Sequence, residues 1–349
     1  MMTSRERVKR AIHFQRPDHI PHYLPDGGEN DILWAAPWTV GAGLGPADIQ
    51  PWTHCGDIDR RIDAWGVTWE RSAQRNGDMG QAKRYPIEDI RRHGQYRFPD
   101  RNNPAYYVGH KTAIEDNNRS ANPKYVLGVM GFSSLNEAVH NILGLETMFI
   151  SYYEHPNEVK SLIARFADAQ RDSIRLMADL GCDGVMGYDD WGLQNRLMIH
   201  RSLIEEFFMP HYRENWALAH ALGLDVWLHS CGWIIDLLPT FYDAGLNVIQ
   251  MDQQENMGLA NLAERIGGRL AFWCPVDIQK TLAQGSSDEI ERYVQTMMAT
   301  IGRFNGGLIS MAYTTPDAID LDPVRVAAMC AAFRKYGIYD GAEIGIERG

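Results

Sequence analysis

Residues 184–229 read GVMGYDDWGLQNRLMIHRSLIEEFFMPHYRENWALAHALGLDVWLH and contain the pattern from which the fold follows. The segment begins and ends with short apolar runs, Gly184–Gly187 and Asp225–His229, each of the length of a buried strand. Between them, from Arg201, apolar residues recur at steps of three and four up to Gly223, which is typical of an amphipathic helix that stops at a glycine. This order predicts two parallel strands joined by a right-handed crossover.

The same alternation continues along the chain. Helical patterns cover Pro156–Leu180, Leu259–Ile266, Ser287–Arg303 and Pro323–Tyr336. The expected strands are Ile20–Leu24, Val67–Glu70, Tyr125–Val129, Gly184–Gly187, Asp225–His229, Asn247–Met251, Leu270–Trp273 and Leu308–Met311. Eight such units predict an α/β fold, a single (β/α)8 TIM barrel that spans residues 1–349 as one domain.

Residues 25–125 depart from this alternation. They hold the second expected strand among irregular, glycine- and proline-rich sequence, so we expect a long irregular excursion over the C-terminal mouth of the barrel. This part of the chain contains five of the ten tryptophans: Trp34, Trp38, Trp52, Trp65 and Trp69. Their rings either line an apolar substrate pocket or pack the excursion onto the barrel.

The composition excludes several classes of protein. With 34 basic and 45 acidic residues the net charge is −11, which disfavours a nucleic-acid-binding surface. No apolar run approaches the roughly 18 residues of a membrane helix, and the charged N-terminal residues lack the apolar core of a signal peptide. The five cysteines form no small disulfide framework, so we expect a reducing, cytoplasmic location.

The strongest chemical signal is the sequence LHSCG at the end of the fifth expected strand. His229 and Cys231 are two positions apart, so both side chains project from one face of the strand. Imidazole nitrogen and thiolate sulfur are preferred zinc ligands, and a catalytic zinc site keeps one position open. The pair could instead be a hydrogen-bonded histidine beside a small buried cysteine. A third ligand would be Cys274 after the seventh strand, which could equally be a small turn residue, or Asp252 after the sixth.

Two adjacent carboxylates, Asp189 and Asp190, follow the fourth expected strand. Such a pair can bind a cation, accept hydrogen bonds from a substrate or act as a general base. One of them could instead cap the helix that begins near His200 or pair with Arg196. We therefore expect one structural and one functional aspartate, and both are candidate catalytic residues.

Further polar and aromatic residues at strand ends are candidate substrate contacts. The run around Gln250 and Asp252 suits either a polar pocket floor or an ordinary solvated loop. Asp277 could contact substrate or begin the helix that follows it. The candidate substrate-binding residues are Trp191, Gln194, Gln250, Asp252 and Asp277, and the candidate metal ligands are His229, Cys231 and Cys274.

Several segments resemble the uroporphyrinogen decarboxylase superfamily. They are SRERVKRAIHFQRPDHIP at 4–21, YDDWGLQ at 188–194, LHSCG at 228–232, FWCPVDIQKTLAQGSSDEIERYV at 272–294 and GGLISMAYTTPDAIDLDPVRVAAMCAAFRKYG at 306–337. The resemblance implies a (β/α)8 barrel and is stronger to the methyltransferase branch. Enzymes of that branch move a methyl group between a small donor or thiol and the cobalt of a corrinoid protein. Their His-x-Cys pair holds zinc and is matched here by His229 and Cys231.

The chain departs from its relatives at two positions. True uroporphyrinogen decarboxylases carry an arginine-rich segment after the first strand, whereas residues 23–31 here read YLPDGGEND and contain no arginine. A porphyrinogen with many carboxylates is therefore not the expected substrate. Thiol-activating methyltransferases take a third zinc ligand, a cysteine, from the end of the eighth strand, where this chain has Met311.

The residues and the resemblance together predict a zinc-dependent methyltransferase that works with a corrinoid protein or a related methyl carrier. Zinc would activate a small methylated substrate such as a methyl ether, giving O-demethylation, and Asp189 or Asp190 would orient the substrate. One alternative is a metal-free decarboxylase or lyase of a small carboxylic acid that uses Asp189 and Asp190. Another is a non-catalytic barrel that binds a small ligand or a corrinoid protein. A homodimer is common among such barrels.

Overall fold

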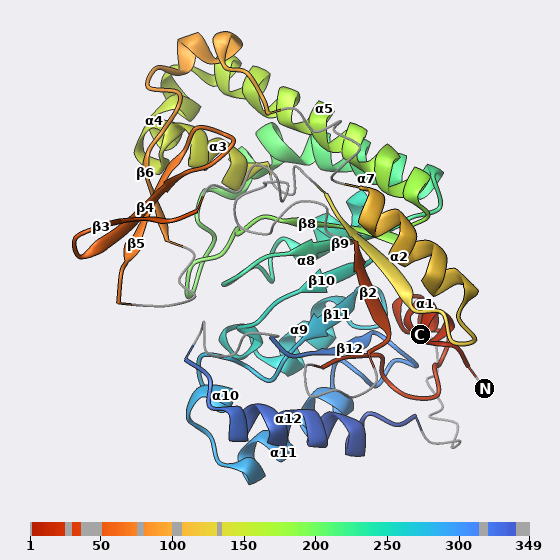
Figure 1. Cartoon of the computed structure of the whole chain (residues 1–349). Coiled ribbons are helices and arrows are strands. Elements are labelled where there is room, and N and C mark those ends of the chain that lie inside the picture. The colour runs from red at the N-terminus through yellow and green to blue at the C-terminus, as the bar shows by residue number, and fades with distance from the viewer. Residues whose placement is uncertain are drawn as a thin grey trace.

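Eight strands of the computed structural model form one parallel sheet that curls into a nearly closed barrel (Figure 1). The structure describes residues 2–24, 30–35, 51–74, 80–99, 107–130, 135–313 and 320–339. The barrel strands are β1 (His22–Tyr23), β2 (Ile32–Ala35), β7 (Tyr125–Val129), β8 (Gly184–Tyr188), β9 (Asp225–His229), β10 (Val248–Gln250), β11 (Ala271–Cys274) and β12 (Leu308–Met311). Their order is β1-β12-β11-β10-β9-β8-β7-β2, and every bonded pair is parallel. The predicted (β/α)8 barrel is confirmed.

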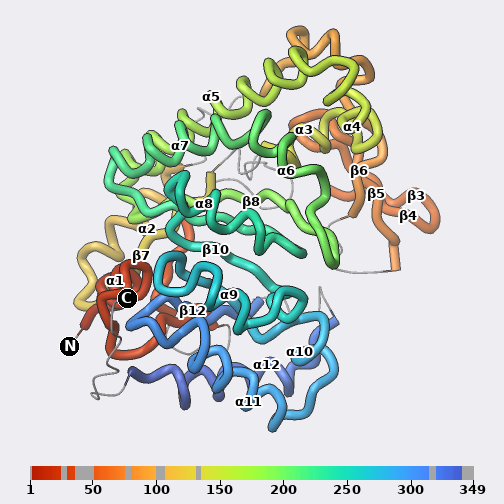
Figure 2. Tube along the Cα trace, turned by 180° about the vertical axis from the view of Figure 1, so that it is seen from behind, coloured from red at the N-terminus to blue at the C-terminus, as the bar shows by residue number. Residues whose placement is uncertain are grey.

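Helices cover the outside of the barrel, as the opposite view shows for α7, α9 and α12 (Figure 2). Their N-termini follow the expected signals: α11 begins with a capping box between Ser286 and Glu289, and Asp322 caps α12 ahead of Pro323. The α-helices are α1 (Ser4–Ile12), α2 (Val108–Arg119), α3 (Asn136–Leu143), α4 (Leu145–Glu154), α5 (Pro156–Leu180), α6 (Arg201–Leu203), α7 (Met209–Ala221), α8 (Leu238–Ala244), α9 (Leu259–Ile266), α10 (Thr281–Gln284), α11 (Ser287–Ala299) and α12 (Pro323–Tyr336). Shorter helical turns are η2 (Ile90–Gln95), the π-turn η4 (Ile204–Phe208) and η5 (Gln254–Asn256).

Because successive side chains of a strand point to opposite faces, the barrel strands contribute to two apolar cores, one inside the barrel and one between the sheet and the helices. Trp227 and Trp273 point into the barrel, where their rings lie 5.4 Å apart at 88°. Phe272, one position before Trp273, packs between the sheet and the helices instead. Since alternate residues share a face, His229 at the end of β9 and Gln250 at the end of β10 also point inward, and they are neighbours in register. The carboxyl end of the barrel interior is therefore polar.

The helix α1 closes the opposite end of the barrel. Its residues Val8, Ala11 and Ile12 belong to the interior core. Arg7 holds the helix to the start of β2 through an ion pair of 2.7 Å with the buried Asp31. His13, just after the helix, lies 3.0 Å from Asp225 at the start of β9. The amino ends of the strands are thus covered by α1, and an active site would lie at the carboxyl ends, as in other TIM barrels.

The contact between His13 and Asp225 predicts a pH-dependent contribution to stability. The hydrogen bond to Asp225 raises the pKa of His13 above its ordinary 6.5. A pKa that is raised on folding stabilises the protein fully below the unfolded value, and this stabilisation is lost as the pH rises through the folded value. Because His13 is 44% exposed, we expect less than about 1 kcal/mol.

Denaturant unfolding of the wild type and of His13→Gln between pH 5.5 and 8.5 checks this expectation. The difference in the free energy of unfolding should be largest below pH 6 and shrink as the pH rises. A difference that is independent of pH would show that the ion pair contributes nothing.

The second barrel strand is not the one that the sequence predicts. Residues 67–70 fall in β5 (Thr68–Ser72) of a separate antiparallel sheet, with β3 (Thr53–Cys55), β4 (Ile58–Ile62) and β6 (Gln81–Arg84). The barrel position belongs to β2, which pairs with β7. The expected irregular excursion therefore contains a small sheet of its own, which projects from the barrel (Figure 1).

Three tryptophans of the excursion, Trp52, Trp65 and Trp69, pack within it or against α5. Trp52 lies 4.4 Å from the guanidinium groups of both Arg61 and Arg71. Trp65 contacts Phe166 of α5, with 5.8 Å between the ring centroids. The indole of Trp69 donates to Asp63 at 2.7 Å, whereas Trp34 belongs to β2 and faces the barrel interior. Trp38 lies outside the described residues.

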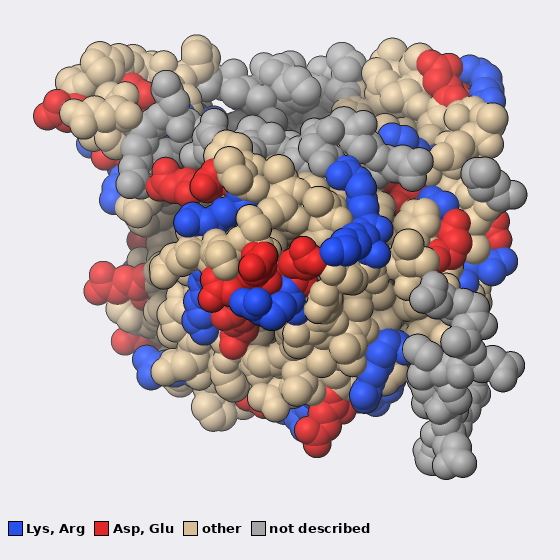
Figure 3. Space-filling model, turned by 90° about the horizontal axis from the view of Figure 1, so that it is seen from below, with Lys and Arg blue, Asp and Glu red and all other residues tan. Residues whose placement is uncertain are grey.

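Acidic and basic side chains are mixed on the surface. On the face in Figure 3, Lys and Arg lie beside Asp and Glu instead of gathering into one basic patch. Among the helices within the described ranges, none combines the length and the apolar character that crossing a membrane requires.

Candidate metal centre

Three side chains with metal-ligating atoms meet at the carboxyl end of the barrel. The Nε2 atom of His229 lies 3.4 Å from the sulfur of Cys231 and 3.4 Å from Oδ1 of Asp190. The three ligand atoms lie within 4.8 Å of one another, and this is the one such cluster in the part of the chain that the structure describes. A carboxylate from the loop after β8 thus joins the pair from the end of β9.

The loops after β8 and β9 come together because each has a glycine at the contact. A Cβ atom on Gly192 would lie 2.3 Å from the amide nitrogen of Trp233, and one on Gly232 would lie 2.3 Å from the carbonyl oxygen of Gly192. Gly232 also has a φ of +77°, which favours glycine. The close approach lets the amide of Cys231 donate to Asp190 Oδ1 at 2.7 Å. This bond brings Asp190 to the pair.

The other ring nitrogen of His229 faces Gln250. Its Nδ1 is hydrogen-bonded to Oε1 of Gln250. Gln250 in turn donates from Nε2 to Asp252 Oδ1 at 2.7 Å and to the sulfur of Met311 at 3.2 Å. The hydroxyl of Tyr313 donates to Asp252 as well. Gln250 and Asp252, expected to contact substrate, are instead buried next to His229.

Charges within the cluster shift its titration. Burial lowers the pKa of His229, but the hydrogen bonds with Asp190 and Cys231 outweigh it and raise that pKa well above the ordinary value. Burial raises the pKa of the Cys231 thiol. Burial also opposes the charge of Asp190, yet the contact with His229 keeps the pKa of this carboxyl below its ordinary value. Without a metal, the cluster therefore favours a carboxylate next to a protonated imidazole.

Glu137 is a member of the site that no sequence pattern indicates. Burial, together with the charges of Asp190 and Asp189, raises the pKa of Glu137 to about 8. It is the second residue of α3 and reaches the site because α3 packs against the loop after β8. Only the tertiary structure brings it there.

Of the two aspartates, one of which we expect to be structural, Asp189 is the one whose oxygens are bound within the fold. Its carboxylate lies at the N-terminus of α3 and is buried. It accepts from the amides of Leu135 at 2.8 Å, Asn136 at 3.2 Å and Glu137 at 2.9 Å, and from the hydroxyl of Tyr212. Burial raises the pKa of Asp189 to about 6, although these hydrogen bonds act to lower it. The oxygens of Asp189 are used in holding α3, and Asp190 is the carboxylate that faces the site.

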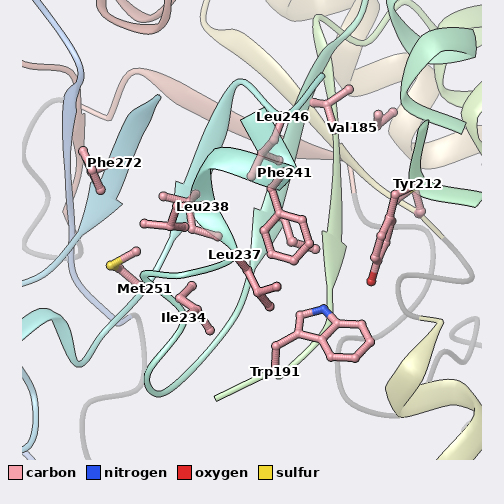
Figure 4. Close-up of a cluster of buried hydrophobic side chains, with 14 of the residues drawn as sticks. Val185, Trp191, Tyr212, Ile234, Leu237, Leu238, Phe241, Leu246, Met251 and Phe272 are labelled. Atoms are coloured by element: carbon pink, nitrogen blue, oxygen red, sulfur yellow. The ribbon is translucent and has the colours of Figure 1, made fainter. Parts of the chain in front are cut away.

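Trp191 is likewise a core residue and not a substrate contact. Its ring is buried among apolar side chains that include Phe241 and Leu237 (Figure 4). It packs edge-on against Phe208, with ring centroids 4.9 Å apart. Because Trp191 follows Asp190 directly, burial of the indole anchors the loop that carries the carboxylate.

Two other candidate substrate contacts, Gln194 and Asp277, are bound to neighbouring loop residues. Gln194 is exposed and accepts from the side chain of Asn256 at 3.1 Å. Asp277 is buried and accepts from the amides of Glu255, Gln279 and Lys280, each at 3.0 Å, so it stabilises the turn after β11.

Cys274, expected as a metal ligand, is fully buried in the core between sheet and helices and is absent from the cluster of ligand atoms. In strand β11 the side chain of Trp273 points into the barrel, so the next side chain, that of Cys274, points outward. Asp190, and not Cys274, is the third residue of the cluster.

Comparisons with known proteins agree with the barrel fold. The structure of a methyltransferase from Methanosarcina mazei superposes with a TM-score of 0.67 at 14% sequence identity, covering 96% of this chain and 99% of that chain, so the two proteins share a fold. D-psicose 3-epimerase aligns with a TM-score of 0.40 at 11% identity, over 71% of this chain and 84% of its own. No curated protein matches the sequence. The profile of uroporphyrinogen decarboxylase (URO-D) matches residues 137–336, more than half of the chain. The chain therefore belongs to the uroporphyrinogen decarboxylase family.

Proposed function

We propose that this protein is a zinc-dependent methyltransferase that moves a methyl group between a small methylated substrate, such as a methyl ether, and a corrinoid protein. The observation that carries the proposal is the cluster of Asp190, His229 and Cys231 at the mouth of a URO-D barrel. The fold shared with the Methanosarcina mazei methyltransferase supports it. The five free cysteines suit the reducing cytoplasm, where we place the protein.

The donor set fits zinc. One imidazole nitrogen, one thiol sulfur and one carboxylate oxygen are the ligand types that zinc prefers, whereas magnesium and calcium prefer oxygen alone. Three protein ligands leave the fourth tetrahedral position for a substrate, as in catalytic zinc sites. When bound there, zinc would supply a Lewis acid that polarises a substrate heteroatom.

The charges around the cluster select the substrate class. Glu137 and Asp252 add carboxyl groups to that of Asp190. Among the described residues, no Lys or Arg forms a hydrogen bond or ion pair with the side chains of these three residues. Asp190, whose pKa lies below its ordinary value, would repel a substrate with several carboxylates, such as a porphyrinogen, and no paired Lys or Arg offsets this charge. A neutral methyl ether meets no such repulsion, and Asp190 can orient it next to His229.

The arrangement does not favour a metal-free decarboxylase that uses both aspartates. Such an enzyme would need Asp189 and Asp190 to face a common substrate. The oxygens of Asp189 instead accept four hydrogen bonds from α3 and Tyr212, and its side chain is buried. Of the two aspartates, only Asp190 is available, and it lies next to an imidazole and a thiol. These three ligand types suit a metal site better than a pair of catalytic carboxylates.

Methyl transfer to cob(I)alamin tests the proposal. Zinc-loaded protein is mixed with aryl and alkyl methyl ethers and either a corrinoid protein or free cob(I)alamin, and the absorption change to methylcobalamin is followed. We expect transfer from at least one ether, loss of transfer after chelation and recovery when zinc is returned. Methyl transfer that continues at the same rate after chelation would overturn the proposal. So would the absence of methyl transfer from every ether tested with zinc-loaded protein.

A further inference from the structure

We propose that Gln250 and Asp252 are positioning residues that hold His229 in the tautomer whose Nε2 lone pair faces the metal position. This inference rests on the proposed function, because it assumes a metal at that position. Gln250 is 2% exposed and Asp252 is 1% exposed. They lie at the Nδ1 side of the imidazole, whereas Asp190 and Cys231 lie at Nε2. At this position Gln250 and Asp252 are better placed to orient His229, the metal ligand, than to contact a substrate.

The neighbours of Gln250 determine which way its amide points. Its Nε2 lies 2.7 Å from Asp252 Oδ1 and 3.2 Å from the sulfur of Met311. A carboxylate and a thioether have no hydrogen to donate, so the NH2 end of the amide must face them. The carbonyl end, Oε1, is then directed at Nδ1 of His229. Two independent acceptors thus select one of the two amide orientations.

The orientation of the amide determines the tautomer of the histidine. Oε1 of Gln250 can only accept, so Nδ1 of His229 must carry the hydrogen. A histidine binds a metal in its neutral form, which has one N–H, so with the hydrogen on Nδ1 the lone pair would be on Nε2, the nitrogen next to Cys231 and Asp190. A hydrogen on Nε2 would exclude the metal.

Met311, the last residue of β12, and Tyr313, just after the strand, complete the network. Tyr313 donates to the second oxygen of Asp252, which holds this carboxylate next to Gln250. Met311 stands where the resemblance places the third zinc ligand of thiol-activating relatives, but its sulfur accepts from Gln250 instead. The chain therefore uses this strand end to orient a ligand, and Asp190 supplies the third donor from the loop after β8.

The variant Asp252→Asn tests the positioning role. Asparagine keeps the size of the side chain but presents a donor as well as an acceptor, so the amide of Gln250 is no longer held in one orientation. Hydrogen-bond partners of zinc-ligating histidines typically change metal affinity by about 10- to 100-fold. We expect the zinc Kd, measured by competition with a chromophoric chelator, to rise by about that factor.

Asp63→Asn is the matched control. Asp63 is also a buried aspartate, 6% exposed, and it also accepts from an aromatic donor, the indole of Trp69 at 2.7 Å. It lies in the turn between β4 and β5, within the excursion and away from the barrel mouth. Its replacement should leave the zinc Kd at the wild-type value.

A spectroscopic readout separates positioning from a general loss of structure. In zinc-loaded protein labelled with ¹⁵N-histidine, we expect the Nδ1 hydrogen of His229 to exchange slowly in the wild type and faster in Asp252→Asn. If Asp252→Asn does not fold, Gln250→Leu, which removes the acceptor at Nδ1, must show the weakened zinc binding.

The outcomes separate this inference from the proposed function. Wild-type protein that takes up no zinc would refute both. Wild-type protein that takes up zinc and transfers methyl groups, together with a folded Asp252→Asn or Gln250→Leu that binds zinc as tightly, would refute the positioning role alone.

Discussion

Replacing His229 with alanine is expected to give a folded protein that holds no zinc and whose kcat/KM for methyl transfer is at least about 100-fold lower. The side chain lies at the mouth of the barrel and not in either apolar core, so its loss removes little packing. The loss leaves Asp190 and Cys231, and two donors are too few for a stable zinc site. Metal analysis of the purified variant, with initial rates at saturating corrinoid, measures both effects.

Cys231→Ser should also lose its zinc and its methyl transfer, whereas Cys274→Ala is the control that should keep its zinc. Both residues are cysteines near strand ends, but the thiol of Cys274 lies in the core between sheet and helices. Its replacement should lower the melting temperature and leave one zinc per chain. Full zinc content in His229→Ala, or loss of zinc in Cys274→Ala, would contradict the assigned ligand set.

Gly232→Ala is expected to have the second large effect, on stability and on zinc content together. The residue has a φ of +77°, and its new Cβ would lie 2.3 Å from the carbonyl oxygen of Gly192. Backbone strain and a clash between two main chains should together lower the free energy of unfolding by at least about 3 kcal/mol. The loops after β8 and β9 must separate, so Asp190 loses its bond to the amide of Cys231.

Gly223→Ala isolates the contribution of the backbone conformation. Gly223 has a φ of +78°, but a Cβ there meets nothing within 4 Å. This variant should be destabilised by only about 1–2 kcal/mol and keep its zinc. Denaturant unfolding and metal analysis of the pair measure the difference. Equal destabilisation, with zinc retained in both, would show that the two loops do not need the glycine contact.

The regular half of the barrel could be predicted from sequence because each strand there is a short apolar run between helical patterns. The expected strand over residues 67–70 is present as β5, but its expected place in the barrel is wrong, because Trp69 and its neighbours alternate like any half-buried strand. Local alternation does not distinguish a small antiparallel sheet from a barrel position. The true second strand, β2, is short and lies in a segment rich in glycine and proline.

The site was predictable only where spacing within one strand fixes geometry. His229 ends β9 and Cys231 follows two positions later, so the spacing places both side chains on one side of the chain, 3.4 Å apart at Nε2 and sulfur. The same rule, applied to Trp273 and Cys274, would have excluded Cys274, since the inward position belongs to Trp273. Glu137 and Tyr313 could not be found, because they come from other elements and carry no motif. Long-range packing, not pattern, brings them to the cluster.

X-ray absorption at the zinc edge of the purified protein tests the central claim most directly, because it counts the sulfur ligands. We expect one sulfur at about 2.3 Å, from Cys231, with nitrogen and oxygen donors at about 2.0–2.2 Å, from His229, Asp190 and the open position. A spectrum with two sulfurs, or protein that retains no zinc when zinc is supplied, would contradict the proposed centre.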